Sequence, residues 1–167
     1  MNGTERINGV DLFVRRFGDP SRPTLVVVHG GPGWDHSYLL AAAELQDIAY
    51  VVFLDLRGCG RSTREAELQP NLLAVLAGVR FSSAWDRPFL EGRLRPARPA
   101  DPARAIAGHP VLILHGEHDL AFPVAAARRL AGEVATARLV VVPEAGHMAQ
   151  FDNPGAWLGA IREFLTA

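Results

Sequence analysis

Residues 24–33 read TLVVVHGGPG, and this stretch decides the fold. Thr24 to His29 form an almost unbroken apolar run, with a proline before it and the Gly30-Gly31 pair after it. Such a run is typical of a central parallel strand that is buried on both faces. We therefore expect a buried strand that ends in a glycine-rich loop.

The segments on both sides of this strand alternate between strand-like and helix-like patterns. Residues 6–12 read as a hairpin in which Asn8 and Gly9 form the two-residue turn, and its second strand continues to about Phe17. Residues 50–54 read as a second fully buried strand, because nearly all of them are apolar. The remaining elements that we expect are a helix at 35–47 with Leu39, Leu40, Ala43 and Leu45 on its buried side, helices at 70–80, 124–134 and 154–165, and strands at 110–114 and 138–142.

This alternation predicts the fold class. Strand, turn, helix and strand at both ends of the chain favour an α/β domain with a mostly parallel sheet and flanking helices. The last helix has a clear start, because Asn153 is placed to cap it and Pro154 lies in its first turn. The loops at 29–33, 117–119 and 144–147 follow strand ends, so we expect them on the carboxyl rim of the sheet, where ligands bind in such folds.

The composition bears on partners and location. The chain has 167 residues, enough for one domain with a real core, and its formal net charge of -1 gives no reason to expect nucleic acid. No apolar run approaches the roughly 20 residues of a membrane span, and the N-terminus does not read as a secretory signal. A single cysteine, Cys59, excludes an internal disulfide and fits a cytoplasmic protein. We expect no cofactor.

Three loops carry residues that could do chemistry. In the loop at 29–33, glycine lets the backbone approach a substrate closely, and the N–H of Gly31 could point at a developing oxyanion. A plain tight turn is the alternative, whereas a phosphate-binding loop would need a Gly-Lys-Ser/Thr string that is absent. Asp119 and His147 end the other two loops and could take part in catalysis. The alternative is that Asp119 is an ordinary surface residue in a turn and that His147 is a solvated or structural histidine. The remaining histidines show no metal-ligand spacing, so we expect no metal site from His36, His109, His115 and His118.

The glycine-rich string closely resembles the oxyanion loop of α/β-hydrolases in the proline iminopeptidase group. This resemblance covers residues 29–34, HGGPGW, and implies that Gly30, Gly31 and Trp34 bind the substrate or the oxyanion. Residues 55–62, DLRGCGRS, are similar to a string of the same group that shapes a turn beside the site. We interpret this second string as structural.

The end of the chain resembles the same family. Its G-x-x-D turn maps onto Gly116–Asp119, and its Gly-His pair maps onto Gly146 and His147. The resemblance implies that Asp119 is the triad acid and that His147 is the catalytic base. It also implies hydrolysis of N-terminal peptide, amide or ester bonds in a peptide or small-molecule substrate.

The nucleophile of that family is missing from the sequence. The family reaction begins at a serine in a G-x-S-x-G turn, but none of the five serines here has glycine at both positions -2 and +2. Only 57 positions separate Ser62 from Asp119, whereas one βαβ unit takes about 30 residues. We infer an internal deletion of the elbow strand, its neighbour and most of the lid. The expected single, truncated domain at 1–167 then has an N-terminal half at 1–62, a lid remnant or connector at 63–105 and a C-terminal half at 106–167.

The deletion leaves several functions open. The chain could descend from an iminopeptidase and lack serine-hydrolase activity, which is our first expectation. It could instead work without serine, with His147 and Asp119 as a general base, or be a degenerate or interaction module. Loss of the elbow strand leaves the strands at 24–28 and 110–114 either paired directly or with open edges. Because an open apolar edge invites pairing with another chain, we expect a possible homodimer.

Overall fold

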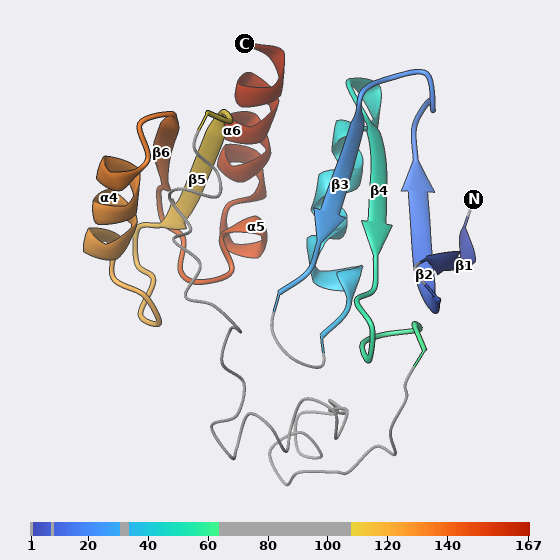
Figure 1. Cartoon of the computed structure of the whole chain (residues 1–167). Coiled ribbons are helices and arrows are strands. Elements are labelled where there is room, and N and C mark those ends of the chain that lie inside the picture. The colour runs from blue at the N-terminus through green and yellow to red at the C-terminus, as the bar shows by residue number, and fades with distance from the viewer. Residues whose placement is uncertain (1, 8, 31–33, 64–107) are drawn as a thin grey trace, which may run out of the picture. The chain divides into compact units, whose positions relative to one another are not determined.

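The computed structural model describes residues 2–7, 9–30, 34–63 and 108–167 (Figure 1). The chain divides into two compact units, Met1–Arg95 and Pro96–Ala167, and each is described by itself. The expected helix at 70–80 and the expected connector between 63 and 105 lie outside the described residues. The predicted domain boundaries stay a prediction.

The N-terminal unit begins with the predicted hairpin. Strand β1 (Asn2–Ile7) pairs antiparallel with β2 (Val10–Phe17), and Ile7 lies opposite Val10. Gly9 has a φ of 80°, a left-handed conformation that glycine adopts without steric cost and that a two-residue hairpin turn requires. The hairpin is therefore confirmed, although Asn8 lies outside the described residues.

The hairpin extends into a four-stranded sheet with the order β1-β2-β4-β3. Strand β4 (Tyr50–Leu54) is antiparallel to β2 and parallel to β3 (Thr24–Val28). Val51 and Phe53 of β4 are fully buried, as expected for a strand with a neighbour on each side. The prediction that residues 24–28 form a central, buried strand is wrong for the described part of this sheet: among the described strands β3 is the last one, and every second side chain is exposed.

One helix packs against this sheet. The helix η1 (His36–Asp47) is a 3-10 helix, and the Asp35 carboxylate caps its start by accepting the N–H of Ser37 at 2.8 Å. Its buried side chains are separated by multiples of three residues, as the three residues per turn of a 3-10 helix require. The expected α-helical stripe is therefore partly wrong, since Leu39, Leu40 and Ala43 are half-buried and the buried residues are His36, Ala42 and Leu45.

The C-terminal unit is a strand-helix-strand-helix arrangement around a two-stranded parallel sheet. Strand β5 (Val111–Gly116) pairs with β6 (Ala137–Val142) over its whole length. The helices α4 (Val124–Glu133) and α6 (Pro154–Thr166) both contact the two strands, and Figure 1 shows them on opposite sides of the pair. A core around fully buried Val142 holds this unit together.

The start of α6 is as predicted. The Asn153 side chain accepts the backbone N–H of Ala156 at 3.1 Å, and Pro154 occupies the first turn. A short helix that the sequence did not indicate, α5 (Ala149–Asp152), precedes it. Parallel pairs of strands with helices beside them confirm the predicted α/β class in a reduced form. Within the described ranges, no helix is long and apolar enough to cross a membrane.

Candidate functional site: an Asp–His pair at the ends of two parallel strands

The two residues predicted to be acid and base lie at hydrogen-bond distance. Asp119 follows β5, His147 follows β6, and the Nδ1 of His147 lies 3.0 Å from Oδ2 of Asp119. Parallel strands end at the same rim, so the loops after β5 and β6 are neighbours. The sequence placed the two residues 28 positions apart, and the parallel pairing brings their side chains together.

Backbone contacts fix the two loops to each other. The N–H of Glu117 donates to the carbonyl of Val142 at 3.0 Å, and the N–H of His118 donates to that of Ala145 at 2.8 Å. Gly116 is required here, because a Cβ on this residue would collide with the carbonyl oxygens of Ala145 and Gly146 in the loop before His147. The loops that carry Asp119 and His147 are therefore held firmly to each other.

The Asp119 carboxylate is held on both oxygens. Its Oδ1 accepts the backbone N–H groups of Ala121 at 2.8 Å and of Phe122 at 3.0 Å, while Oδ2 faces His147. The side chain is only 5 % exposed. Burial by itself raises the pKa of Asp119, but the hydrogen bond from His147 and those from the two backbone N–H groups outweigh it and lower the pKa from its usual 3.8 to about 2. Asp119 is therefore a carboxylate at neutral pH.

This lowered pKa predicts how stability depends on pH. Because Asp119 releases its proton more readily in the folded state, its contribution to stability is fully present above about pH 4 and is lost as the pH falls through about 2. The difference in unfolding free energy between the wild type and Asp119→Asn should therefore shrink between pH 4 and pH 2. Urea unfolding of both proteins across this range measures it. A difference that does not change with pH would contradict the assignment.

The imidazole of His147 is oriented for proton transfer. Its Nδ1 donates to the Asp119 carboxylate, so the lone pair of the neutral ring is on Nε2. The His147 side chain is 54 % exposed, which leaves the ring accessible to solvent. The ring of Phe122 lies 5.7 Å from that of His147 and supports one side of it. This geometry suits a general base.

A further histidine contacts this site, although the sequence analysis weighed it only as a possible metal ligand. His115, on β5, donates from Nε2 to the Phe122 carbonyl at 2.9 Å, and the same nitrogen is 3.7 Å from Oδ2 of Asp119. His115 thereby connects the strand to the loop that carries both Asp119 and Phe122. The available signal was a polar side chain at the carboxyl end of an otherwise apolar strand.

The oxyanion-side residues belong to the N-terminal unit. The N–H of Gly30 donates to the Tyr38 hydroxyl at 2.6 Å, and the Trp34 ring makes an edge contact with Tyr38 at 5.3 Å between ring centroids. Trp34 is 46 % exposed. Gly31 lies outside the described residues. The predicted roles of Gly30, Gly31 and Trp34 stay predictions.

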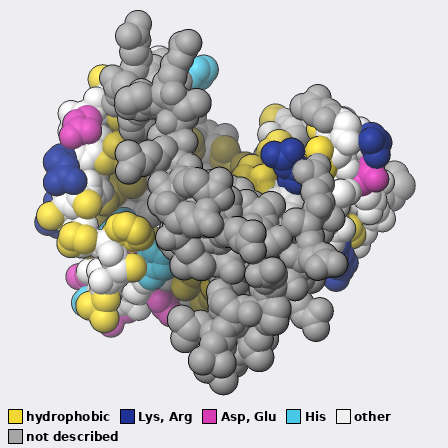
Figure 2. Space-filling view, turned by 60° about the horizontal axis from the view of Figure 1, so that its bottom comes forward, with side chains coloured by type: hydrophobic (Ala, Val, Ile, Leu, Met, Phe, Trp, Pro, Cys, Tyr) yellow, Lys and Arg dark blue, Asp and Glu magenta, His cyan; other side chains and the backbone are white. Residues whose placement is uncertain are grey.

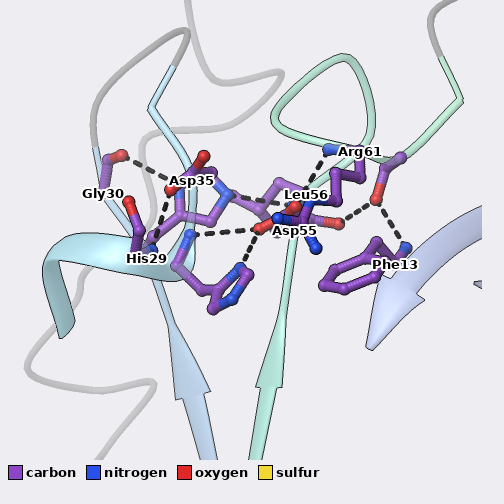
Figure 3. A network of polar contacts seen from close by, with 10 residues as sticks. Phe13, His29, Gly30, Asp35, Asp55, Leu56 and Arg61 are labelled. Atoms are coloured by element: carbon purple, nitrogen blue, oxygen red, sulfur yellow. Dashed lines mark hydrogen bonds and ion pairs between the residues drawn. The ribbon is translucent and has the colours of Figure 1, made fainter. Parts of the chain in front are cut away.

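The DLRGCGRS string forms a buried polar network beside that loop (Figure 3). The Asp55 carboxylate is fully buried; its Oδ1 accepts the backbone N–H of His36 at 3.0 Å and the His36 Nδ1–H at 2.7 Å, and its Oδ2 accepts the N–H of Arg61 at 2.9 Å. The Ser62 hydroxyl donates to the Asp55 carbonyl at 2.6 Å and accepts the N–H of Phe13 at 2.8 Å. These contacts agree with the structural interpretation of this string.

His29, at the end of β3, also serves this loop. Its Nε2 accepts the backbone N–H of Leu56 at 3.0 Å, so the ring proton is on Nδ1, which faces the Gly30 carbonyl (Figure 3). Cys59 is buried in the same loop. His29 therefore ties the start of the glycine-rich loop to the turn after β4.

One group of exposed side chains in the described ranges could hold a metal ion. The ligand atoms of Glu117, His118 and Glu144 lie within 4.8 Å of one another. Exposed groups of this kind are common in proteins without a metal. The expectation that the protein has no metal site therefore stays a prediction.

Comparison with known proteins identifies the class. A family model described as alpha/beta hydrolase fold matches residues 68–154, just over half of the chain. The chain belongs to the alpha/beta hydrolase fold family. The matched range includes most of the stretch that we assigned to a lid remnant or connector.

Within this family, the chain is similar to proline iminopeptidases. It is 40% identical over 62 residues to the proline iminopeptidase of Saccharolobus solfataricus, a match that covers 36% of this chain and 20% of that protein. It is 35% identical over 66 residues to that of Lactobacillus helveticus, covering 38% of this chain and 22% of the relative. The chain thus spans about a fifth of the length of the curated relatives it matches.

Solved structures show the same fold. A serine hydrolase involved in carbazole degradation aligns with a TM-score of 0.73 at 15% identity, over 99% of this chain and 98% of that one. The enol-lactonase from Burkholderia xenovorans LB400 aligns with a TM-score of 0.70 at 18% identity, over 99% of this chain and 100% of that one. At this identity the likeness concerns the fold.

Proposed function

We propose that this chain descends from a proline iminopeptidase-type hydrolase and retains only the acid–base part of its catalytic machinery. In this proposal His147 is a general base, Asp119 orients it, and no covalent acyl-serine forms. The observation that supports it is the 3.0 Å contact between His147 Nδ1 and a buried Asp119 carboxylate with a pKa of about 2. The substrate would be a small ester, amide or peptide.

The proposed reaction is attack by water. His147 Nε2 takes a proton from a water molecule while the water oxygen bonds to the carbonyl carbon of the substrate. The imidazolium that forms is stabilised by the Asp119 carboxylate. It then returns the proton to the leaving group as the bond between the carbonyl carbon and that group breaks. Every proton in this scheme moves through one nitrogen of His147.

Covalent catalysis by serine is absent from this proposal for a reason in the sequence. The family nucleophile lies in a G-x-S-x-G turn, which this sequence does not contain. The string at residues 55–62 ends in Ser62, but this residue is 4 % exposed and its hydroxyl is bonded to two backbone groups. We attribute the missing turn to an internal deletion between Ser62 and Asp119.

A fluorophosphonate probe tests the mechanism, because it labels serines that an adjacent base activates. We expect no stoichiometric labelling of the five serines, measured by intact-protein mass spectrometry with an active serine esterase as the positive control. Hydrolysis of p-nitrophenyl acetate in the same samples reports general-base activity. Stoichiometric labelling would contradict the serine-free mechanism. Failure to hydrolyse this ester faster than free imidazole would instead favour a non-enzymatic module.

Location in the cell is a second part of the proposal. The only cysteine, Cys59, is buried in the loop after β4, and a chain with one cysteine gains nothing from an oxidising compartment. We therefore propose a cytoplasmic protein. Microscopy of the full chain with a C-terminal fluorescent tag would check this.

A further inference from the structure

The four outer edges of the two sheets differ in charge. An edge strand exposes unpaired backbone N–H and C=O groups, and proteins block such edges with charged side chains. Strand β1 carries Glu5 and Arg6, and strand β6 carries Arg138, which pairs with Glu163 at 2.7 Å. Strands β3 and β5 contain no Asp, Glu, Lys or Arg. Two of the four edges are therefore protected by charge, and two are not.

The unprotected edge of β5 lies in a groove. A cavity of about 350 Å³ is lined by the consecutive residues 113–116 of β5, by Ala127 and Leu130 of α4, and by Trp157 of α6. The same cavity also reaches Asp119 and His147, so a strand added here would lie beside the candidate site. Side chains alternate between the two faces of a strand, so a cavity that touches four consecutive residues lies along the edge of the strand. The groove thus has helices on both sides, which is the environment of a parallel strand buried on both faces.

The unprotected edge of β3 has the complementary properties. Val26 and Val28 point to the same face and are 52 % and 53 % exposed, whereas a valine in a parallel strand is normally buried. Among the described strands, β3 pairs only with β4. Figure 2 shows hydrophobic side chains at the surface of both described parts of the chain. Within the part of the chain that the structure describes, β3 therefore has one unpaired edge and two largely exposed valines.

We propose that β3 of one copy of the chain adds to the free edge of β5 in a second copy. The backbone of β3 hydrogen-bonds to β5 as an added strand, and its valines enter the groove between α4 and α6 of the other copy. This pairing satisfies both unprotected edges at once, and neither strand contributes an Asp, Glu, Lys or Arg side chain to the contact. A second copy is the occupant because the chain itself carries the matching strand.

Analytical ultracentrifugation of the full chain over a range of concentrations tests this pairing. We expect the wild type to self-associate. Val28→Lys on β3 and Leu130→Lys on α4 each place a charge in the contact, so each should weaken association at least about 100-fold. Both side chains are already partly exposed, so the substitutions should leave the fold of the single copy intact. Leu165→Lys, at a 43 % exposed position of α6 outside the groove, is the matched control and should associate like the wild type.

Mixing the two variants distinguishes β3–β5 pairing from other ways in which two copies could associate. The Val28→Lys copy keeps an intact β5 edge and the Leu130→Lys copy keeps an intact β3 edge, so the mixture should associate again although neither variant does alone. A monomeric wild type overturns the proposal, as does self-association of Leu130→Lys, which would indicate β3–β3 contacts. Circular dichroism verifies folding, and Val26→Lys with Leu130→Glu replaces any variant that fails to fold. The readout is mass, so the result does not depend on the proposed catalytic function.

Discussion

Asp55→Ala should lower the free energy of unfolding of the N-terminal unit by about 3–5 kcal/mol, because it removes a fully buried carboxylate and leaves its donors without a partner. Those donors are the backbone N–H and Nδ1–H of His36 and the backbone N–H of Arg61. Since a whole domain is stable by only about 5–15 kcal/mol, this loss should be visible as a large shift of the urea midpoint.

Asp11→Ala is the matched control for this experiment. Asp11 also accepts an arginine hydrogen bond, from Arg6 at 3.2 Å, but both side chains are exposed. Exposed ion pairs contribute about 0–1 kcal/mol, so this variant should unfold close to the wild type. An Asp55→Ala midpoint equal to that of Asp11→Ala would show that the buried network does not stabilise the unit.

His147→Ala should reduce the hydrolysis of p-nitrophenyl acetate by about 10²–10⁴-fold, the usual contribution of a positioned general base. The loss should appear in kcat/KM, measured under pseudo-first-order conditions. Asp119→Asn should also reduce the rate, because an amide in place of the carboxylate no longer stabilises the imidazolium and can hold the ring in the wrong tautomer.

His109→Ala is the control for the histidine substitution. His109 is exposed, and its backbone carbonyl accepts the Thr136 hydroxyl at 2.5 Å. Its replacement should leave the rate unchanged and so corrects for the background reactivity of exposed imidazoles. Equal rates for His147→Ala and His109→Ala would refute a general-base role for His147.

The sequence by itself determined the local elements of the fold where short-range signals were strong. The Asn8-Gly9 pair predicted the hairpin, and Asn153 with Pro154 predicted the start of α6, because turn and cap chemistry depend on a few neighbouring residues. The apolar runs predicted β3 to β6 as strands of parallel pairs. The family resemblance implied the roles of Asp119 and His147, which stay predictions, and the strand ends predicted that their loops are neighbours.

Only the tertiary structure decided the rest, because it depends on which segments become neighbours. An apolar run shows that a strand can be buried, but the order of the described strands decides that β4 is buried and that β3 lies at the edge. The role of His115 likewise depends on a contact with the Phe122 carbonyl across the loop. Periodicity could not distinguish the 3-10 from the α form of η1, so its buried face was partly misassigned. Turns and helix caps depend on residues that are adjacent in the sequence. Burial, and the distance between Asp119 and His147, depend on contacts between residues that are far apart in the sequence.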